Sequence, residues 1–127
     1  MTRVLIVFGA GGTGCATRYL ISTWAGARFG TTFPYGTMIV NLVGAFLMTF
    51  VMELSLRIVA FPEDLKLALT TGFLGGLTTY SAFNYETSTL ALDGKAGPSL
   101  LNVGMTLIGC VATGLLGLAL ARLLTRA

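Results

Sequence analysis

The chain has 127 residues, of which 54% are hydrophobic and only 10% are charged, and its mean hydropathy is +0.83. A composition this apolar excludes an ordinary soluble domain of the same size and indicates an integral membrane protein. The net charge of +3 rests on eight basic residues that are scattered singly along the chain, which argues against a nucleic-acid-binding surface.

Four stretches with almost no charge are long enough to cross a bilayer, which takes about 20 mostly apolar residues. The connections between them carry turn signals, namely Pro34, Pro62 and the pair Asp93-Gly94. The sequence therefore predicts an all-α membrane protein in one domain, with both termini on one side of the membrane. The four predicted transmembrane helices cover approximately residues 4–27, 29–57, 67–90 and 96–122.

The first span contains two patterns that have other interpretations. Residues 9–14 satisfy the dinucleotide pattern G-x-G-x-x-G, but that fingerprint needs an acidic residue about 20 positions later, and the first acid in the chain is Glu53. Arg3, an apolar run and a small-residue site at 25–27 are similar to a signal peptide, although Arg18 interrupts the pattern. We favour a third interpretation, in which the glycines of residues 9–14 let a neighbouring helix approach closely.

The second and fourth spans carry polar side chains at helical spacing. Thr37 and Asn41 are four residues apart, as are Asn102, Thr106 and Cys110, so each set shares one helix face. A threonine in a membrane helix commonly bonds to its own backbone. The amide of Asn41 is harder to satisfy in hydrocarbon, and it needs partners across an interface or in a permeating ion.

The third span is the most informative segment of the chain. No charge occurs between Leu67 and Tyr85, and the middle reads Gly-Phe-Leu-Gly-Gly-Leu-Thr-Thr-Tyr-Ser-Ala-Phe over residues 72–83. A glycine pair followed by two threonines inside a span of lipid length predicts a helix that is broken at mid-membrane. Broken membrane helices usually bind ions.

The basic residues are almost balanced between the two ends of the predicted bundle. Three lie on the side away from the termini, counting Arg18, and five lie on the side of the termini: Arg3, Arg57, Lys66, Arg122 and Arg126. The positive-inside rule thus favours cytoplasmic termini only modestly. A chain with balanced charges can insert both ways, which permits an antiparallel, dual-topology homodimer.

Three motifs in chain order resemble those of the Fluc (CrcB) family of microbial fluoride channels, and the resemblance covers nearly the whole chain. The motifs are residues 11–19, residues 34–44 and the third-span segment described above. The resemblance implies an antiparallel homodimer with two fluoride pores and one structural sodium ion at the dimer interface. By the same match, the backbone carbonyls of Gly75 and Thr78 from both subunits would ligate the sodium ion.

The resemblance also implies an anion pathway. Tyr80 and Phe83 match two aromatic residues that present ring edges to fluoride, and ring edges carry the positive end of the aromatic quadrupole. Asn41 matches the pore asparagine, and the other residues of the implied pathway are Thr37, Ser81, Asn102, Thr106 and Cys110. Glu86 matches an acid at the pore mouth. Arg18 matches a vestibule arginine, for which the alternative is snorkelling to the lipid headgroups.

The chain departs from the family pattern at three positions. Tyr80 stands where phenylalanine is usual, Ala82 where threonine is usual, and Cys110 where serine is expected. Tyr80 adds a hydroxyl that can bond fluoride, narrow the path or shift the ring. A thiol is a weaker donor than a hydroxyl. These departures leave the expected fold unchanged and predict a slower channel or an altered pore chemistry.

We expect passive, fluoride-selective export that relieves fluoride toxicity, from a multi-pass protein of the inner (plasma) membrane. An enzyme is not expected, because the sequence has no histidine, no paired carboxylates within a span, and no serine or cysteine beside a base. Two alternatives stay open. A small multidrug-type exporter would need an acid in the first span, which has none, and a non-conducting structural membrane protein would need only the packing glycines.

Overall fold

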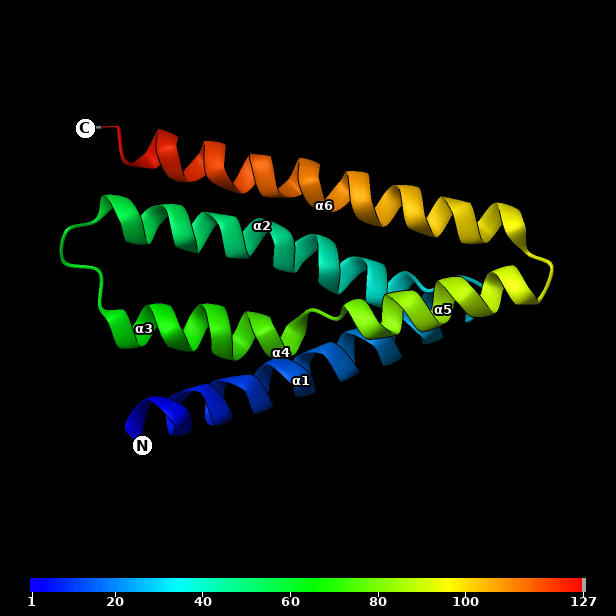
Figure 1. Cartoon of the computed structure of the whole chain (residues 1–127), viewed down its shortest axis with the longest axis horizontal. Coiled ribbons are helices and arrows are strands. Elements are labelled where there is room, and N and C mark those ends of the chain that lie inside the picture. The colour runs from blue at the N-terminus through cyan, green and yellow to red at the C-terminus, as the bar shows by residue number, and fades with distance from the viewer. Residues whose placement is uncertain (127) are drawn as a thin grey trace.

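The computed structural model describes residues 1–126, and in those residues every regular element is helical. Four rods lie side by side, and the two termini are at the same end (Figure 1). Three rods are single helices and the other is segmented, as predicted. The elements are α1 (Thr2–Phe29), α2 (Tyr35–Arg57), α3 (Glu63–Leu67), the π-helix η1 (Ala68–Leu74), α4 (Gly75–Leu77), α5 (Tyr80–Leu92) and α6 (Ala96–Leu124).

The rods have the lengths and composition of membrane-spanning segments. Helices α1, α2 and α6 are each long and apolar enough to cross a bilayer. Helix α1 ends where Gly30 adopts φ +84, and α2 begins only after Pro34, so residues 30–34 form a connection within the predicted span 29–57. The segmented rod begins at Glu63, before the predicted start at residue 67.

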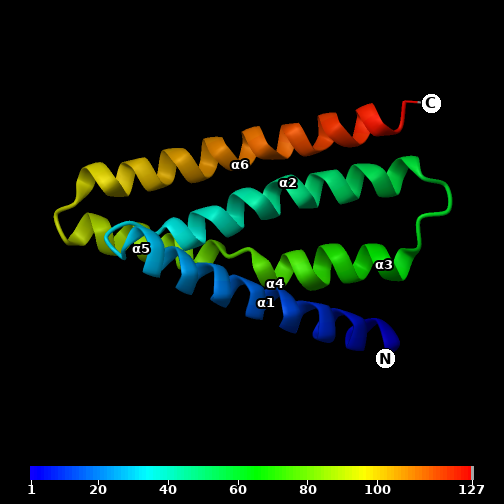
Figure 2. The same ribbon diagram turned by 180° about the vertical axis from the view of Figure 1, so that it is seen from behind.

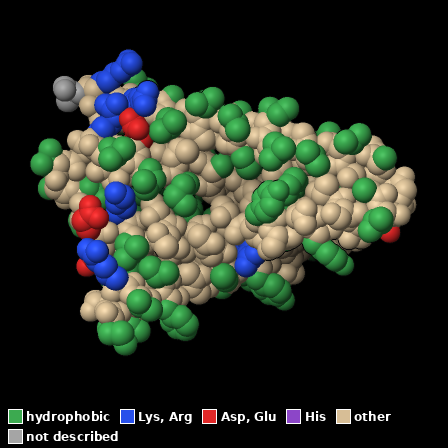
Figure 3. Space-filling view, viewed as in Figure 1, with side chains coloured by type: hydrophobic (Ala, Val, Ile, Leu, Met, Phe, Trp, Pro, Cys, Tyr) green, Lys and Arg blue, Asp and Glu red, His purple; other side chains and the backbone are tan. Residues whose placement is uncertain are grey.

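Most large apolar side chains face outward, which is the arrangement that a lipid environment favours. The buried apolar cluster is small and centres on Val40, Leu74 and Leu77. Hydrophobic side chains are spread along the surface, whereas most charged ones gather at the end where the chain termini lie (Figure 3). Together with the three long apolar helices, this distribution identifies a multi-pass membrane protein.

The segmented rod is interrupted at two threonines. Helix α4 ends at Leu77, Thr78 and Thr79 are both extended (φ −82, ψ 155 and φ −154, ψ 116), and α5 resumes at Tyr80. This interruption is visible as a thin connection between α4 and α5 in the view from behind (Figure 2). The predicted break is therefore confirmed, and it lies at the threonines, because the glycine pair before it stays helical.

The glycines of the break motif have a packing role instead. A Cβ added to Gly76 would collide with the carbonyl oxygen of Gly11, and one added to Gly14 would collide with the carbonyl oxygen of Phe73. Helix α1 and the segment η1–α4 are thus in backbone-to-backbone contact. Residues 9–14 lie inside α1 with no strand before them, so their glycines do not form a dinucleotide-binding turn.

Candidate functional site

Asn41 clamps the broken backbone from the neighbouring helix α2. Its Nδ2 donates to the carbonyl oxygen of Thr79 at 3.0 Å, and its Oδ1 accepts from the Thr79 N–H at 2.8 Å. The side chain therefore replaces the hydrogen bonds that Thr79 would make in a continuous helix. An asparagine amide has two N–H donors, and the Thr79 carbonyl uses one of them. Asn41 fixes the break and keeps a second donor.

The backbone carbonyls of residues 75–78 lose their ordinary donors at the break. In a continuous helix the N–H of residue i bonds to the carbonyl of residue i−4. The Thr79 N–H, which would reach Gly75, goes to Asn41. The Ala82 N–H, which would reach Thr78, goes to the hydroxyl of Thr79 at 3.2 Å. The N–H groups of Tyr80 and Ser81 make no backbone hydrogen bond across the break, so the carbonyls of residues 76 and 77 are released as well. Of these four carbonyls, those of Gly75 and Thr78 are the pair that the family resemblance assigns to a cation.

A cavity of about 430 Å³ lies beside the break, between α2, α5 and α6. Most of its wall is apolar, with a few polar groups from three elements. The predicted pathway residues that line it are Asn41, Tyr80, Phe83, Thr106 and Cys110. Residues from sequence positions as far apart as 41 and 110 therefore meet at one place, which is the arrangement of a binding site with few, well-placed polar groups.

The two aromatic residues at this cavity have different environments. Their ring centroids are 5.7 Å apart with an interplanar angle of 48°. Phe83 is only 6% exposed, whereas Tyr80 is 75% exposed. Phe83 therefore forms part of the buried wall of the cavity, whereas the ring of Tyr80 lies at its open edge, where no other part of this chain covers it.

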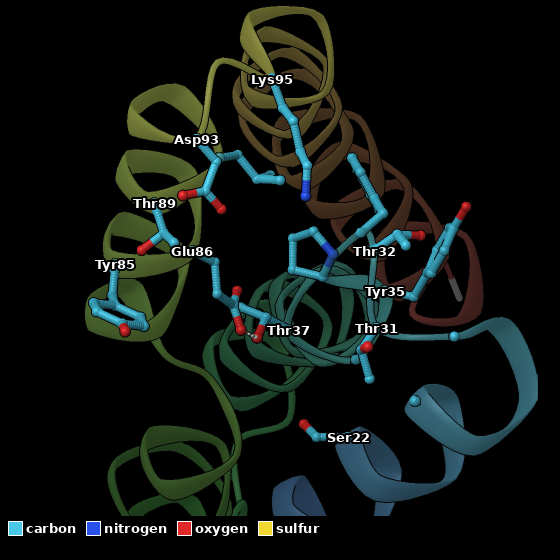
Figure 4. Close-up of a pocket in the computed structure, with 16 residues that line it drawn as sticks. Ser22, Thr31, Thr32, Tyr35, Thr37, Tyr85, Glu86, Thr89, Asp93 and Lys95 are labelled. Carbon is cyan, nitrogen blue, oxygen red and sulfur yellow. Dashed lines mark hydrogen bonds between the residues drawn. The ribbon is translucent and has the colours of Figure 1, made fainter.

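A second, more polar cavity of about 330 Å³ lies at the end of the bundle away from the termini. Thr37 and Glu86 face each other in it, and the Thr37 hydroxyl donates to Oε1 of Glu86 at 2.7 Å (Figure 4). Oε2 of Glu86 is buried and has no hydrogen-bond partner among residues 1–126. Asp93 and Lys95 also line this cavity. From the sequence, Asp93 was predicted only as part of a turn, and Lys95 was not predicted as a site residue.

The first and second cavities follow the same two helix faces. Thr37 lies one turn before Asn41 on α2, and Glu86 lies three residues after Phe83 on α5. On each helix, therefore, one residue lines the polar cavity (Thr37 or Glu86) and a nearby one lines the cavity at the break (Asn41 or Phe83). The Thr37–Glu86 hydrogen bond lies in the polar cavity, about one helical turn from the residues that line the mostly apolar one.

Asn102 lies in a polar network between α5 and α6 and lines neither of these cavities. Its Nδ2 donates to the hydroxyl of Thr87 at 2.8 Å, and its Oδ1 is 3.5 Å from the Thr106 hydroxyl. Ser99 donates to the Thr87 carbonyl at 2.9 Å. Thr87 was not predicted from the sequence, although its position one turn beyond Phe83 was a usable signal. Through Thr106 the network reaches the cavity at the break.

Two other predicted residues lie outside both cavities. The hydroxyl of Ser81 is 3.2 Å from that of Thr79, so it supports the cap of α5. Arg18 lies on α1, and its Nη2 is 3.8 Å from the sulfur of Cys15. This chain alone brings neither side chain to the lining of these cavities.

Comparison with known proteins identifies relatives over nearly the full length of the chain. A family model described as "CrcB-like protein, Camphor Resistance (CrcB)" matches residues 5–118. The protein named "Fluoride-specific ion channel FluC" of Geobacter metallireducens is 45% identical over 122 residues, which cover 96% of this chain and 98% of that protein. Proteins of the same name from Citrifermentans bemidjiense and Anaeromyxobacter dehalogenans are each 43% identical, covering 98% and 96% of this chain and 100% and 97% of their own.

Proposed function

Because the chain belongs to the CrcB family, we propose that it is a fluoride-selective ion channel through which the ion passes passively down its electrochemical gradient. Relatives that are named as fluoride-specific ion channels match it almost end to end. The observation that carries the proposal is the cavity at the helix break, where Asn41, Phe83 and Thr106 converge.

The donors at this cavity suit a small, hard anion. Moving an anion into a low-dielectric site is costly unless donors replace its lost water. The second amide N–H of Asn41, the hydroxyl of Thr106, the thiol of Cys110 and the aromatic ring edges can act in this way. Among residues 1–126, no lysine or arginine lines this cavity, and so an ion bound there would remain free to leave.

The proposed route runs from the polar cavity to the cavity at the break. Fluoride would enter at Thr37 and Glu86, the proposed pore mouth, and pass between Asn41 and Phe83. Asn102 would support this route by holding Thr106, and Ser81 by holding the cap of α5. Arg18 would belong to the vestibule only in an assembly of two chains.

We propose an antiparallel homodimer because this chain builds only part of the site. The cavity at the break is bordered by the exposed ring of Tyr80, and Gly75 is exposed as well. A second copy in the opposite orientation would cover both, and two-fold symmetry would give two pores per dimer. Crosslinking between single cysteines placed near Lys95 and Arg57 would occur in such a dimer and would be absent from a parallel one.

The carbonyls of Gly75 and Thr78 fit a sodium ion at the centre of this dimer. Both have lost their helical donors, and a carbonyl without a partner is costly in hydrocarbon. Four such oxygens, two from each subunit, would replace water around a hard monovalent cation. This ion would be structural, because the transported anion would use the side chains on the other side of the break.

The proposed physiological role is export of fluoride that accumulates inside an acid-exposed cell, from a position in the inner (plasma) membrane. The direction follows from passive conduction, since the ion leaves wherever its inside concentration and the membrane potential favour exit. The alternatives are a multidrug-type exporter and a non-conducting structural protein. The relatives are named as ion channels, which favours neither.

Fluoride release from liposomes that contain the purified protein tests the proposal. The vesicles are loaded with potassium fluoride, potassium is shunted by an ionophore, and a fluoride electrode records release. We expect rapid release of fluoride and no comparable release from vesicles loaded with chloride. Release no faster than from fluoride-loaded vesicles that lack the protein would refute the channel assignment. Cation-coupled transport of an organic drug would support the exporter.

The tyrosine at position 80 is expected to slow conduction. Its hydroxyl can hold fluoride by an added hydrogen bond, and one such bond is worth about 1 kcal/mol, or about five-fold in rate of escape. We therefore expect Tyr80→Phe to increase the initial rate of fluoride release about five-fold. An unchanged or lower rate in that variant would show that the hydroxyl does not retard the ion.

A further inference from the structure

Two arginines from different helices share one buried carboxylate at the end of the bundle that holds the termini. Oε1 of Glu53 accepts from Nε of Arg57 at 2.7 Å and from Nε of Arg122 at 2.9 Å. The Glu53 side chain is only 11% exposed, whereas those of Arg57 and Arg122 are 38% and 56% exposed. The carboxylate thus lies behind two guanidinium groups that face outward.

The cluster of Glu53, Arg57 and Arg122 keeps unused binding capacity. One carboxylate neutralises one of two guanidinium groups, so the cluster carries a net charge of +1. A guanidinium has five N–H donors, and the bond to Glu53 uses one from each arginine. No other hydrogen bond of these two side chains occurs within residues 1–126. The outward face therefore presents two planar forks that match phosphate oxygens.

The surroundings of this cluster are apolar. Leu56 precedes Arg57, and Leu123 and Leu124 follow Arg122, and all three leucine side chains are exposed. Figure 3 shows basic side chains gathered at this end of the molecule, beside hydrophobic ones. The ends of α2 and α6, two helices of membrane length, lie there together. A ligand that suits this surface has a negatively charged head and an apolar tail.

We propose that Arg57 and Arg122, positioned by Glu53, bind the phosphate group of an anionic phospholipid, with its acyl chains along the exposed leucines. Basic sites between transmembrane helices at headgroup depth bind such lipids. The net charge of +1 favours a lipid with net negative charge over a zwitterionic one. Inorganic phosphate could bind the two arginines in the same way as the lipid headgroup, but it has no acyl chains to pack against the exposed leucines. The site lies at the opposite end of α2 from Thr37, and none of its three residues lines either cavity of the proposed fluoride route.

Native mass spectrometry of the full-length protein in detergent tests the proposal. Phosphatidylglycerol and phosphatidylcholine are titrated separately, and we expect phosphatidylglycerol to bind more tightly. We expect each arginine that contacts the lipid phosphate to contribute about a five-fold change in affinity. The double variant R57Q/R122Q should therefore lose most of the preference. Arg3 is the matched control, because it lies 3.5 Å from the exposed Asp64 and shares no buried carboxylate, and R3Q should leave the preference unchanged.

Three results would overturn the proposal. The first is equal binding of the two lipids by the unmodified protein, a comparison that requires no variant to fold. The second is an unchanged preference in R57Q/R122Q, checked for folding by size-exclusion chromatography. The third is displacement of bound phosphatidylglycerol by inorganic phosphate at the same concentration, which would assign the cluster to free phosphate.

Discussion

Replacing Asn41 with leucine is expected to reduce fluoride release from liposomes to the level of empty vesicles. The substitution removes both hydrogen bonds to Thr79 and the donor at the cavity. The Thr79 N–H would then be buried without a partner, which costs about 1–3 kcal/mol. The extended backbone at the break would no longer be held, and the ring of Phe83, four residues later, would lose its position relative to α2. A fluoride electrode measures the loss directly.

The loss in Asn41→Leu has to be separated from simple unfolding. Size-exclusion chromatography of Asn41→Leu in detergent provides this control, because a folded variant elutes at the same position as the unmodified protein. The free energy of unfolding of Asn41→Leu should fall by about 2 kcal/mol, which leaves a folded protein. Normal flux in Asn41→Leu would place the anion route elsewhere.

The sequence was sufficient to predict the helix break but not the contacts that hold it. A glycine pair and two threonines in an uncharged span mark a place where a helix is weak, which is local information. The partner of Thr79 is Asn41, 38 residues away, and only tertiary packing determines that pairing. The amide of Asn41 was predicted to find partners across an interface or in a permeating ion, and in the structure its first partners are backbone atoms of Thr79.

The same limit explains why the predicted pathway residues are not all in one cavity. Helical spacing correctly places Asn102, Thr106 and Cys110 on one face of α6. It does not reveal that the α5–α6 interface covers the first of them, where Thr87 accepts from Asn102. How far along α6 a polar residue lies thus decides whether α5 covers it or it lines the cavity. Sequence spacing shows which residues share a face but not which of them a neighbouring helix covers.

The sequence also does not show which of its glycines make close contacts between helices. The chain has 17 glycines, and the sequence predicts close helix packing without saying which glycines provide it. A Cβ on Gly12 would meet nothing within 4 Å, whereas one on Gly76 would meet backbone atoms of Gly11 and Cys15. Both positions are glycines, but only Gly76 faces a neighbouring segment closely enough that a side chain would not fit.

Gly76→Ala is therefore expected to destabilise the folded protein strongly. The added Cβ would collide with the Gly11 carbonyl oxygen and lie 3.0 Å from the amide nitrogen of Cys15. Backbone atoms inside a helix cannot rotate away, so α1 would have to separate from α4. Overpacking of this kind costs about 1–3 kcal/mol and occasionally more. We expect the free energy of unfolding to fall by about 3 kcal/mol, measured by chemical denaturation in detergent micelles.

Gly12→Ala is the control that makes this result specific. It introduces the same methyl group one residue after Gly11, on a face of α1 where the structure leaves open space. Alanine is a better helix former than glycine by about 1 kcal/mol, so this variant should be as stable as the unmodified chain or more so. Equal stability of Gly76→Ala and Gly12→Ala would contradict the backbone contact between α1 and α4. Loss of stability in Gly76→Ala alone would show that the glycine before the break holds α1 in place, while the threonines open the helix.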